Sequence, residues 1–229
     1  MAASLQLRLV LAVSLDGRLA PPQGGAAQIG GRGDRRVLEE ALSWADACLI
    51  GGNTLRLHGS TCLIHAVDLL EQRRRDGRSP QPTAVVVSRS GGFDPQLRFF
   101  HQPLERWLLT PAPVPGPAVV GFTRQLPLAD WSAALASLAA VVGPRLLLLG
   151  GAALAAQLLA ADLVDELQLT VCPRLLGGRH SWLPVGVELP PNRWRLLEQR
   201  PLEGEELLLR YARLPAHPVA AAAPPLGLG

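Results

Sequence analysis

Short apolar segments alternate with helical segments along the first 160 residues, and this order constrains the fold more than any other feature. The clearest strand, Thr83–Ser88, is β-branched and ends in polar residues. Asp34 is placed to cap a helix in which apolar residues recur at helical spacing from Val37 to Ala45. Alternation of this kind predicts a mostly parallel sheet with helices on both faces. The expected strands here are 5–13, 46–50, 83–88, 106–110 and 145–149, and the later helices are 66–75, 131–142 and 152–161.

The last third of the chain has a different pattern. Residues 164–172, 194–199 and 205–213 have strand character with little helix between them, which predicts antiparallel pairs at one edge of the sheet. A proline-rich connection at 111–117 and a short strand at 119–122 are expected before the helix at 131–142. The fold class is therefore α/β, with a mostly parallel central sheet and antiparallel C-terminal edge strands.

One domain of ordinary size suits the length of 229 residues, and 48% hydrophobic residues provide a large core. We expect this domain to span residues 1–215 and the Ala/Pro-rich segment 216–229 to be a disordered tail. No apolar run is long enough for a membrane span, and no signal peptide is recognisable, so a cytoplasmic location is expected.

Residue usage excludes several kinds of site. Cys48, Cys62 and Cys172 are widely spaced, which argues against both a zinc site and a disulfide framework. The sequence contains no lysine, which rules out a Schiff-base lysine and a P-loop lysine. A net charge of +3 is too small to indicate a nucleic-acid partner.

Two turns share one design, in which an apolar strand is followed by two glycines and then a helix. The better example is Leu146–Leu154, which contains Gly150 and Gly151; the other contains Gly51 and Gly52. Glycine lets the backbone approach a ligand closely, and free N–H groups in the next helical turn favour an anion such as a pyrophosphate. A tight turn without any ligand explains a single glycine pair equally well.

An arginine between two hydroxyl residues, Ser88-Arg89-Ser90, follows the clearest strand. Arg89 there suits the 2′-phosphate of NADPH through charge-assisted hydrogen bonds. The alternative is an ordinary exposed arginine in a loop.

Four segments in this order resemble the reductase domain of riboflavin biosynthesis. That domain is the C-terminal half of a bifunctional deaminase-reductase and belongs to the dihydrofolate-reductase-like superfamily. The S-L-D-G and L-V-D-E-L…P-x-L-L-G-G pieces, at this separation, are more specific than either glycine pair. The H-x-E and P-C-x-x-C motifs of the deaminase half are absent, so the resemblance is to the reductase alone. The segments are 11–20, 45–55, 83–88 and 149–178.

The resemblance implies a reaction and its cofactor. NADPH would reduce the ribosyl group of 5-amino-6-(5-phosphoribosylamino)uracil to a ribityl group, in a protein that is commonly a homodimer. Ala12 and the turn of Gly51, Gly52 and Thr54 would contact the nicotinamide half, and Ser88 would lie near the adenosine half. Asp16 would lie beside the nicotinamide, to position or protonate the substrate; a simple turn is the alternative. The phosphates would be held by Gly150, Gly151, Ala152, Ala153 and Leu154.

Several substrate positions differ from the pattern of that family. Leu42 stands where an arginine faces the substrate, and Leu149 stands where an acidic residue precedes the second glycine pair. His58 replaces a common aspartate, so His58 or Arg56 is a candidate for contacting the substrate. Two alternatives stay open: the same fold and cofactor with another small carbonyl, imine or pteridine-like substrate, and an NADPH-binding protein without turnover.

Overall fold

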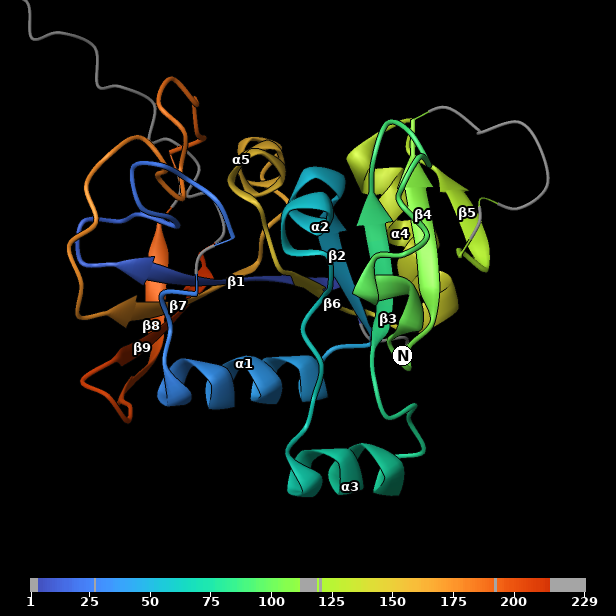
Figure 1. Cartoon of the computed structure of the whole chain (residues 1–229), viewed down its shortest axis with the longest axis horizontal. Helices are drawn as coiled ribbons and strands as arrows, with labels where there is room; N and C mark the ends of the chain where they lie inside the picture. Colours follow the sequence, from blue (N-terminus) through green and yellow to red (C-terminus); the bar gives the residue numbers. More distant parts are fainter. Residues whose placement is uncertain (1–3, 27, 112–118, 120, 192, 215–229) are drawn as a thin grey trace, which may run out of the picture.

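A single sheet runs through the computed structural model, which describes residues 4–26, 28–111, 119, 121–191 and 193–214. The strands of these residues are arranged in the order β5-β4-β3-β2-β6-β1-β7-β9-β8 (Figure 1). Their bounds are β1 Gln6–Ser14, β2 Ala47–Gly51, β3 Thr83–Val87, β4 Arg106–Thr110, β5 Arg124–Pro127, β6 Arg145–Leu148, β7 Glu166–Cys172, β8 Trp194–Pro201 and β9 Leu207–Arg213.

The strand directions confirm the predicted fold class. From β5 to β7 every pairing between the described strands is parallel, and β7–β9 and β9–β8 are antiparallel. In a parallel sheet the carboxyl ends of all strands reach the same edge. The segments after β2, β6 and β1 are therefore neighbours in space although they are far apart in the sequence.

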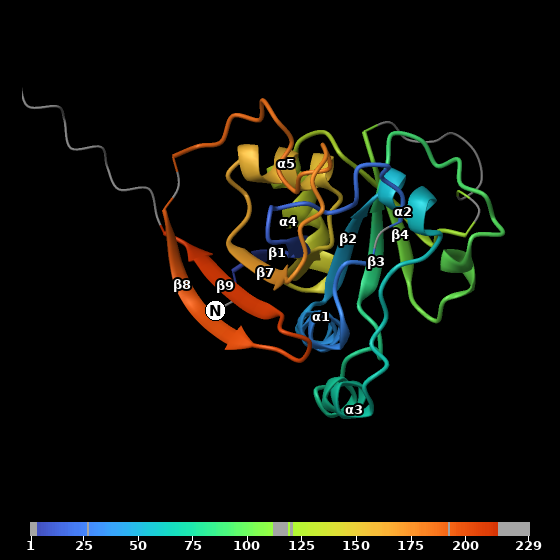
Figure 2. The ribbon, with the colours of Figure 1, turned by 60° about the vertical axis from the view of Figure 1, so that its left-hand side comes forward.

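Helices cover both faces of the sheet, as the alternation predicted (Figure 2). On one face α4 and α5 pack against β1 side chains such as Leu7 and Leu9, which are fully buried. On the other face α1 and α3 pack against a cluster that contains Val10 and Leu147. The helices are α1 Arg32–Trp44, α2 Gly52–His58, α3 Val67–Arg75, α4 Trp131–Val142 and α5 Ala152–Ala160, with a 3₁₀ turn at Arg98–His101.

The prediction of a strand at 119–122 was wrong. Val119, Gly121 and Phe122 lie outside any strand, and the edge strand β5 follows them. Phe122 is buried, and its ring meets the ring of Phe100 edge to face, with the centroids 5.5 Å apart. The apolar residues there fill an aromatic cluster instead of a strand position. The proline-rich connection expected at 111–117 lies outside the described residues, except for Pro111.

The cap expected at the start of α1 was also wrong. Because α1 begins at Arg32, Asp34 lies inside its first turn, and Gly31 occupies the cap position without a side-chain bond. The buried carboxylate of Glu206 accepts hydrogen bonds from the backbone N–H groups of Gly31 and Asp34. These N–H groups have no acceptor inside the helix, so the carboxylate of Glu206, distant in the sequence, caps the helix.

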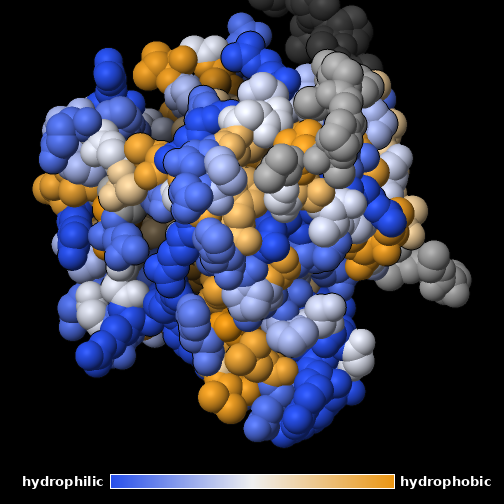
Figure 3. Space-filling view, turned by 45° about the vertical axis from the view of Figure 1, so that its right-hand side comes forward, coloured by the Kyte–Doolittle hydropathy of each residue, from blue (hydrophilic) through white to orange (hydrophobic). Residues whose placement is uncertain are grey.

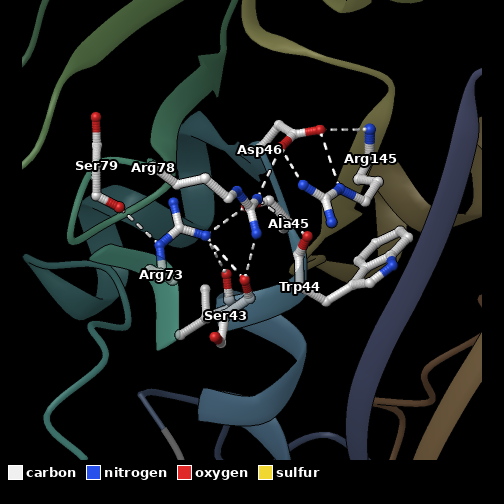
Figure 4. Close-up of polar contacts among 9 residues, drawn as sticks. Ser43, Trp44, Ala45, Asp46, Arg73, Arg78, Ser79 and Arg145 are labelled. Carbon is white, nitrogen blue, oxygen red and sulfur yellow. Dashed lines mark hydrogen bonds and ion pairs between the residues drawn. The ribbon is translucent and has the colours of Figure 1, made fainter. Parts of the chain in front are cut away.

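Two arginines close the other end of α1 (Figure 4). Arg73 is fully buried and donates to the carbonyl oxygens of Ser43 and Ala45 at 2.9 and 2.8 Å. Arg78 donates to the Ser43 carbonyl and to the carboxylate of Asp46, both at 2.7 Å. The last carbonyls of a helix lack intrahelical donors, so these guanidinium groups satisfy them and fix the connection from α1 to β2.

The sheet and its helices extend from Gln6 to Arg213, while the tail expected at 216–229 lies outside the described residues. Within the described part of the chain, no helix has the length and hydropathy to cross a membrane. Figure 3 shows hydrophilic and hydrophobic side chains interspersed over one face, with hydrophobic ones gathered toward the lower part, where α3 lies. Val67 at the start of α3 is 68% exposed.

Candidate active site

The two glycine turns lie side by side at the carboxyl edge of the sheet. β2 and β6 are parallel neighbours, so the chain leaves both strands at the same place. The backbone N–H of Gly51 donates to the carbonyl of Gly150 at 3.1 Å, and the N–H of Gly151 donates to Oγ1 of Thr54 at 3.0 Å. The structure thus joins two turns that are about 100 positions apart in the sequence into one unit.

Side chains larger than hydrogen do not fit at the inner positions of these turns. A Cβ atom on Gly151 would lie 2.6 Å from Oγ1 of Thr54, and one on Gly52 would lie 2.8 Å from Oγ of Ser88. Gly150 has a φ of +86°, which L-residues rarely adopt. Glycine is therefore needed for the turns to meet at the edge where ligands of α/β sheets bind.

Two of the residues expected to hold the phosphates lie at the start of α5. Ala152 and Ala153 are the first residues of this nine-residue helix, where N–H groups have no acceptor within the helix. Leu154 differs, since its N–H donates to the carbonyl of Gly151 at 3.0 Å and its side chain is buried in the core. Ala152 and Ala153 are thus placed to meet an anion, and Leu154 anchors the turn to the core.

Asp16 follows β1 at the same edge of the sheet. Its carboxylate accepts hydrogen bonds from Oγ of Ser14 at 2.6 Å and from the backbone N–H groups of Leu176 and Gly177 at 3.0 and 2.7 Å. The bond from Ser14, followed by that from Leu176, holds the pKa of Asp16 well below its usual range. Asp16 is therefore ionised near neutral pH, and its contacts tie the turn after β1 to the loop after β7.

Arg56 and His58, the candidates for contacting the substrate, lie on α2 after the first glycine turn. Arg56 extends toward the segment after β3, where it donates to the carbonyl of Gly92 at 3.0 Å and stacks on Phe93. The imidazole of His58 is partly desolvated, and burial lowers its pKa. The contacts of Arg56 place it with Ser88 and Ser90, on the predicted adenosine side of the site.

A model of the RibD C-terminal domain family matches residues 6–205, which is most of the chain. The chain belongs to the RibD C-terminal domain family. This membership confirms the resemblance found in the sequence.

Two curated relatives have the same name, 2,5-diamino-6-ribosylamino-4(3H)-pyrimidinone 5′-phosphate reductase. The one from Methanothermobacter thermautotrophicus is 27% identical over 214 residues, which cover 87% of this chain and 94% of the relative. The one from Archaeoglobus fulgidus is 24% identical over 178 residues, which cover 75% of this chain and 81% of the relative. Both relatives are reductases in name, and the alignments cover more than three quarters of each of them.

Solved structures confirm the fold. A pyrimidine reductase-like protein from Corynebacterium diphtheriae superposes with a TM-score of 0.76 at 21% identity, covering 92% of each chain. A dihydrofolate reductase from Enterococcus faecalis, solved with NADP(H), superposes with a TM-score of 0.51 at 12% identity, covering 91% of this chain and 96% of that one. At these identities the likeness shows the dihydrofolate-reductase-like architecture alone.

In this RibD C-terminal domain, the two substituted substrate positions have different surroundings. Leu42 is fully buried in the cluster beneath α1, so its side chain contacts the core instead of a ligand. Leu149 is half-buried directly before the second glycine turn, and its N–H donates to the carbonyl of Leu49 at 2.9 Å. The side chain of Leu149 therefore packs against the same cluster as Leu42, directly before the second glycine turn.

One carboxyl group near the site was missed by the sequence reasoning, which took Asp34 for a cap. Burial, with the nearby charge of Glu206, raises the pKa of Asp34, and a hydrogen bond from Thr170 opposes that rise. Thr170 is the register partner of Ala12 on the neighbouring strand. The signal that could have revealed Asp34 is its place in the first helix after β1, which begins at the carboxyl edge of the sheet.

Proposed function

We propose that this protein is an NADPH-dependent reductase of riboflavin biosynthesis that acts on a phosphoribosylaminopyrimidine. The observation that carries the proposal is the joined pair of glycine turns, with its bonds from Gly51 to Gly150 and from Gly151 to Thr54. Family membership and the names of both curated relatives support the same reaction class.

The residues of the site fit a nicotinamide dinucleotide. The glycines let the two turns meet at the carboxyl edge, and the amides of Ala152 and Ala153 offer donors to its pyrophosphate. Ala12 lies on β1, with the Gly51–Thr54 turn two strands away, so both border the place for the nicotinamide. When bound, NADPH supplies the hydride, and the protein supplies position and exclusion of water.

Reduction of the ribosyl group also needs a proton. Asp16 is unsuited to donate one, because its hydrogen bonds stabilise the ionised form. Its proposed role is to position the loops at 16 and 176–177 around the substrate. Asp34 is better suited to proton transfer, since a raised pKa keeps a carboxyl group protonated closer to neutral pH.

Two substrates differ in one ring substituent. The relatives are named for a 2,5-diaminopyrimidinone, and the sequence resemblance implied the corresponding 5-aminouracil. A Thermotoga maritima deaminase-reductase with this fold carries the uracil substrate in its name, with a TM-score of 0.73 at 17% identity, covering 92% of this chain and 57% of that one. The proposal therefore covers the phosphoribosylaminopyrimidine class, and an assay with both substrates distinguishes the diaminopyrimidinone from the aminouracil.

The remaining proposals concern the assembly and its setting. We propose that residues 1–215 act as one reductase domain, that two copies form a homodimer, and that the protein works in the cytoplasm. Sedimentation of the purified protein tests the dimer, with a monomer at micromolar concentration as the contrary result.

The deciding experiment follows NADPH absorbance and ribityl product with each of the two substrates. Turnover with either one supports the proposal and identifies the ring substituent that the site accepts. NADPH binding with no turnover of either substrate would favour a different small carbonyl, imine or pteridine-like substrate, or a binding protein. No NADPH binding at all would overturn the proposed function.

A further inference from the structure

A cavity of about 380 Å³ lies between α1 and the strands β7, β9 and β8, on the face of the sheet that α1 covers (Figure 2). Its volume falls within the range of about 300–1,000 Å³ that is usual for small-molecule sites. Arg8, which lines the cavity, precedes Ala12 by four residues on β1, which is about 13 Å along the strand. The cavity therefore lies apart from the glycine turns, which follow the carboxyl ends of the strands.

The guanidinium group of Arg8 is buried but only partly satisfied. Arg8 is 7% exposed, and its guanidinium carbon lies 4.0 Å from the centre of the Trp44 ring, a cation–π contact. Its Nε donates to Glu166 at 2.8 Å, whereas Nη1 and Nη2 form no hydrogen bond with any described residue. Both oxygens of Glu166 are already engaged, by Gln6 and Arg210 as well as by Arg8. Two adjacent donors on a planar group are thus left without a partner beside the cavity.

The carboxylates around the cavity are bound to other arginines. Arg200 pairs with Glu40 at 2.7 Å and with Glu198 at 3.1 Å. Glu198 also pairs with Arg210, at 3.0 Å. Burial lowers the pKa of Arg8 although the charge of Glu166 opposes that fall, as expected for a cation with too little counter-charge. The charged residues that line the cavity are Arg8, Arg200, Arg210, Glu40 and Glu198, so that cations outnumber anions by one.

Apolar side chains form much of the remaining wall. Val37 and Ala41 come from α1, Leu208 comes from β9, and the Trp44 ring adds an aromatic surface. An inorganic anion would leave these surfaces in contact with water, whereas an organic acid would cover them, which is favourable.

We propose that this cavity binds a small organic carboxylate, with its charged group on Nη1 and Nη2 of Arg8 and its apolar body against the wall formed by α1 and β9. Two parallel N–H groups of a guanidinium match the two oxygens of a carboxylate, and the apolar wall selects an acid with a hydrocarbon part. Such a ligand would contact α1 and β9 together. It would therefore stabilise the same pair of elements that the cap by Glu206, directly before β9, connects at the start of α1.

The test titrates the protein with benzoate, and with benzamide as a neutral ligand of the same shape, by isothermal titration calorimetry. We expect benzoate to bind with a dissociation constant of about 1 mM, as is usual for so small a ligand, and benzamide to bind at least about tenfold more weakly. Arg8→Lys keeps a charge for Glu166 but loses the two parallel donors, so it should weaken benzoate binding about tenfold or more. Arg75→Lys, on the exposed face of α3, is the matched control and should leave the affinity unchanged.

Urea denaturation shows whether Arg8→Lys is folded, and one further readout needs no variant. The side-chain nitrogen NMR signals of Arg8 in wild-type protein should shift when benzoate is added and stay in place with benzamide. Inorganic phosphate, which has the charge but no apolar body, should displace benzoate poorly. Protein saturated with NADPH should bind benzoate as well as free protein does, because the two sites are separate.

Each contrary result overturns the inference at a different step. Wild-type protein that binds no benzoate at about 20 mM would mean that the cavity holds only water. Equal affinity for benzoate in folded Arg8→Lys, or unchanged Arg8 signals, would place the benzoate elsewhere. Displacement by NADPH would place it at the glycine turns, and equal binding of benzamide or full displacement by phosphate would exclude the proposed class of ligand. None of these results bears on the reductase activity, which is tested separately.

Discussion

The two ends of β2 and β6 use polar groups in opposite ways. At the amino edge, the charges of Arg78 and Arg145 meet the carboxylate of Asp46, and Arg73 meets only carbonyl oxygens (Figure 4). At the carboxyl edge, the first backbone amides of α5 have no acceptor within the helix, and Arg56 donates to the carbonyl of Gly92 and pairs with no carboxylate among the described residues. At the amino edge the polar groups are thus paired with one another, and at the carboxyl edge some remain available to a ligand. Stability and binding should therefore respond separately to changes at the two edges.

The largest expected effect is on stability, from removing the buried guanidinium group at the amino edge. Arg73→Ala leaves the carbonyls of Ser43 and Ala45 without this donor, which should lower the free energy of unfolding by about 3 kcal/mol or more. Urea denaturation measures this loss. Arg75→Ala is the control, because Arg75 is exposed and, among the described residues, pairs with Glu71 alone, which predicts a loss under about 0.5 kcal/mol. Similar losses for the two variants would show that the hydrogen bonds of Arg73 do not stabilise this edge.

Next in size is the effect of a side chain at the carboxyl edge. Gly151→Val should weaken NADPH binding about 100-fold or more, because its Cβ atom would displace Thr54 and the amides beside it. Titration with NADPH gives the affinity, and urea denaturation checks that the variant is folded. Gly151→Ala, which adds only the Cβ atom, provides a milder version of the same change. Unchanged affinity in Gly151→Val would remove this turn from the cofactor site.

A smaller effect should appear in the pH dependence of the amino edge. Burial alone would raise the pKa of Asp46, but the hydrogen bonds and charges of Arg145 and Arg78 outweigh it and lower the pKa. The stabilisation by this carboxylate is thus present above its unfolded pKa and is lost as the pH falls through acidic values. Asp46→Asn should lose about 2 kcal/mol near pH 7 and less near pH 3. A loss that is equal at the two pH values would show that charge is unimportant there.

The smallest expected effect concerns the loop contacts at the carboxyl edge. Asp16→Asn should lower turnover about tenfold and leave NADPH affinity nearly unchanged, because one carboxylate oxygen tying the 176–177 loop becomes an amide nitrogen. The pH profile of turnover should keep its shape near neutral pH, since Asp16 is already ionised there. Asp16→Glu tests whether a displaced carboxylate can substitute. Equal turnover in Asp16→Asn would make Asp16 a turn residue only.

Local patterns were sufficient for most of the fold. The apolar strand and helix periods located β4 and α4 at their observed bounds, because burial against a sheet imposes those periods on the sequence itself. The run at 119–122 was misread because an aromatic cluster requires apolar residues as much as a strand does. Periodicity cannot distinguish these two uses.

The site was predictable in its backbone and less so in its side chains. Gly51, Gly52, Gly150 and Gly151 could be selected because strand, glycines and helix follow one another in the sequence. The bond from Gly151 to Thr54 and the direction of Arg56 depend on which strands become neighbours, and no local pattern encodes that. The contact between Asp34 and Glu206 was equally hidden from the sequence, since the two residues are 172 positions apart.

The carboxylate of Glu206 has a consequence for the order of events at the ribosome. The first helix is synthesised early, but the group that satisfies its leading amides follows 172 positions later. The start of α1 therefore remains without its acceptor until Glu206, directly before β9, has been synthesised. A nascent chain arrested before residue 206 should therefore have a first helix that frays at its start, even though all of that helix is already present.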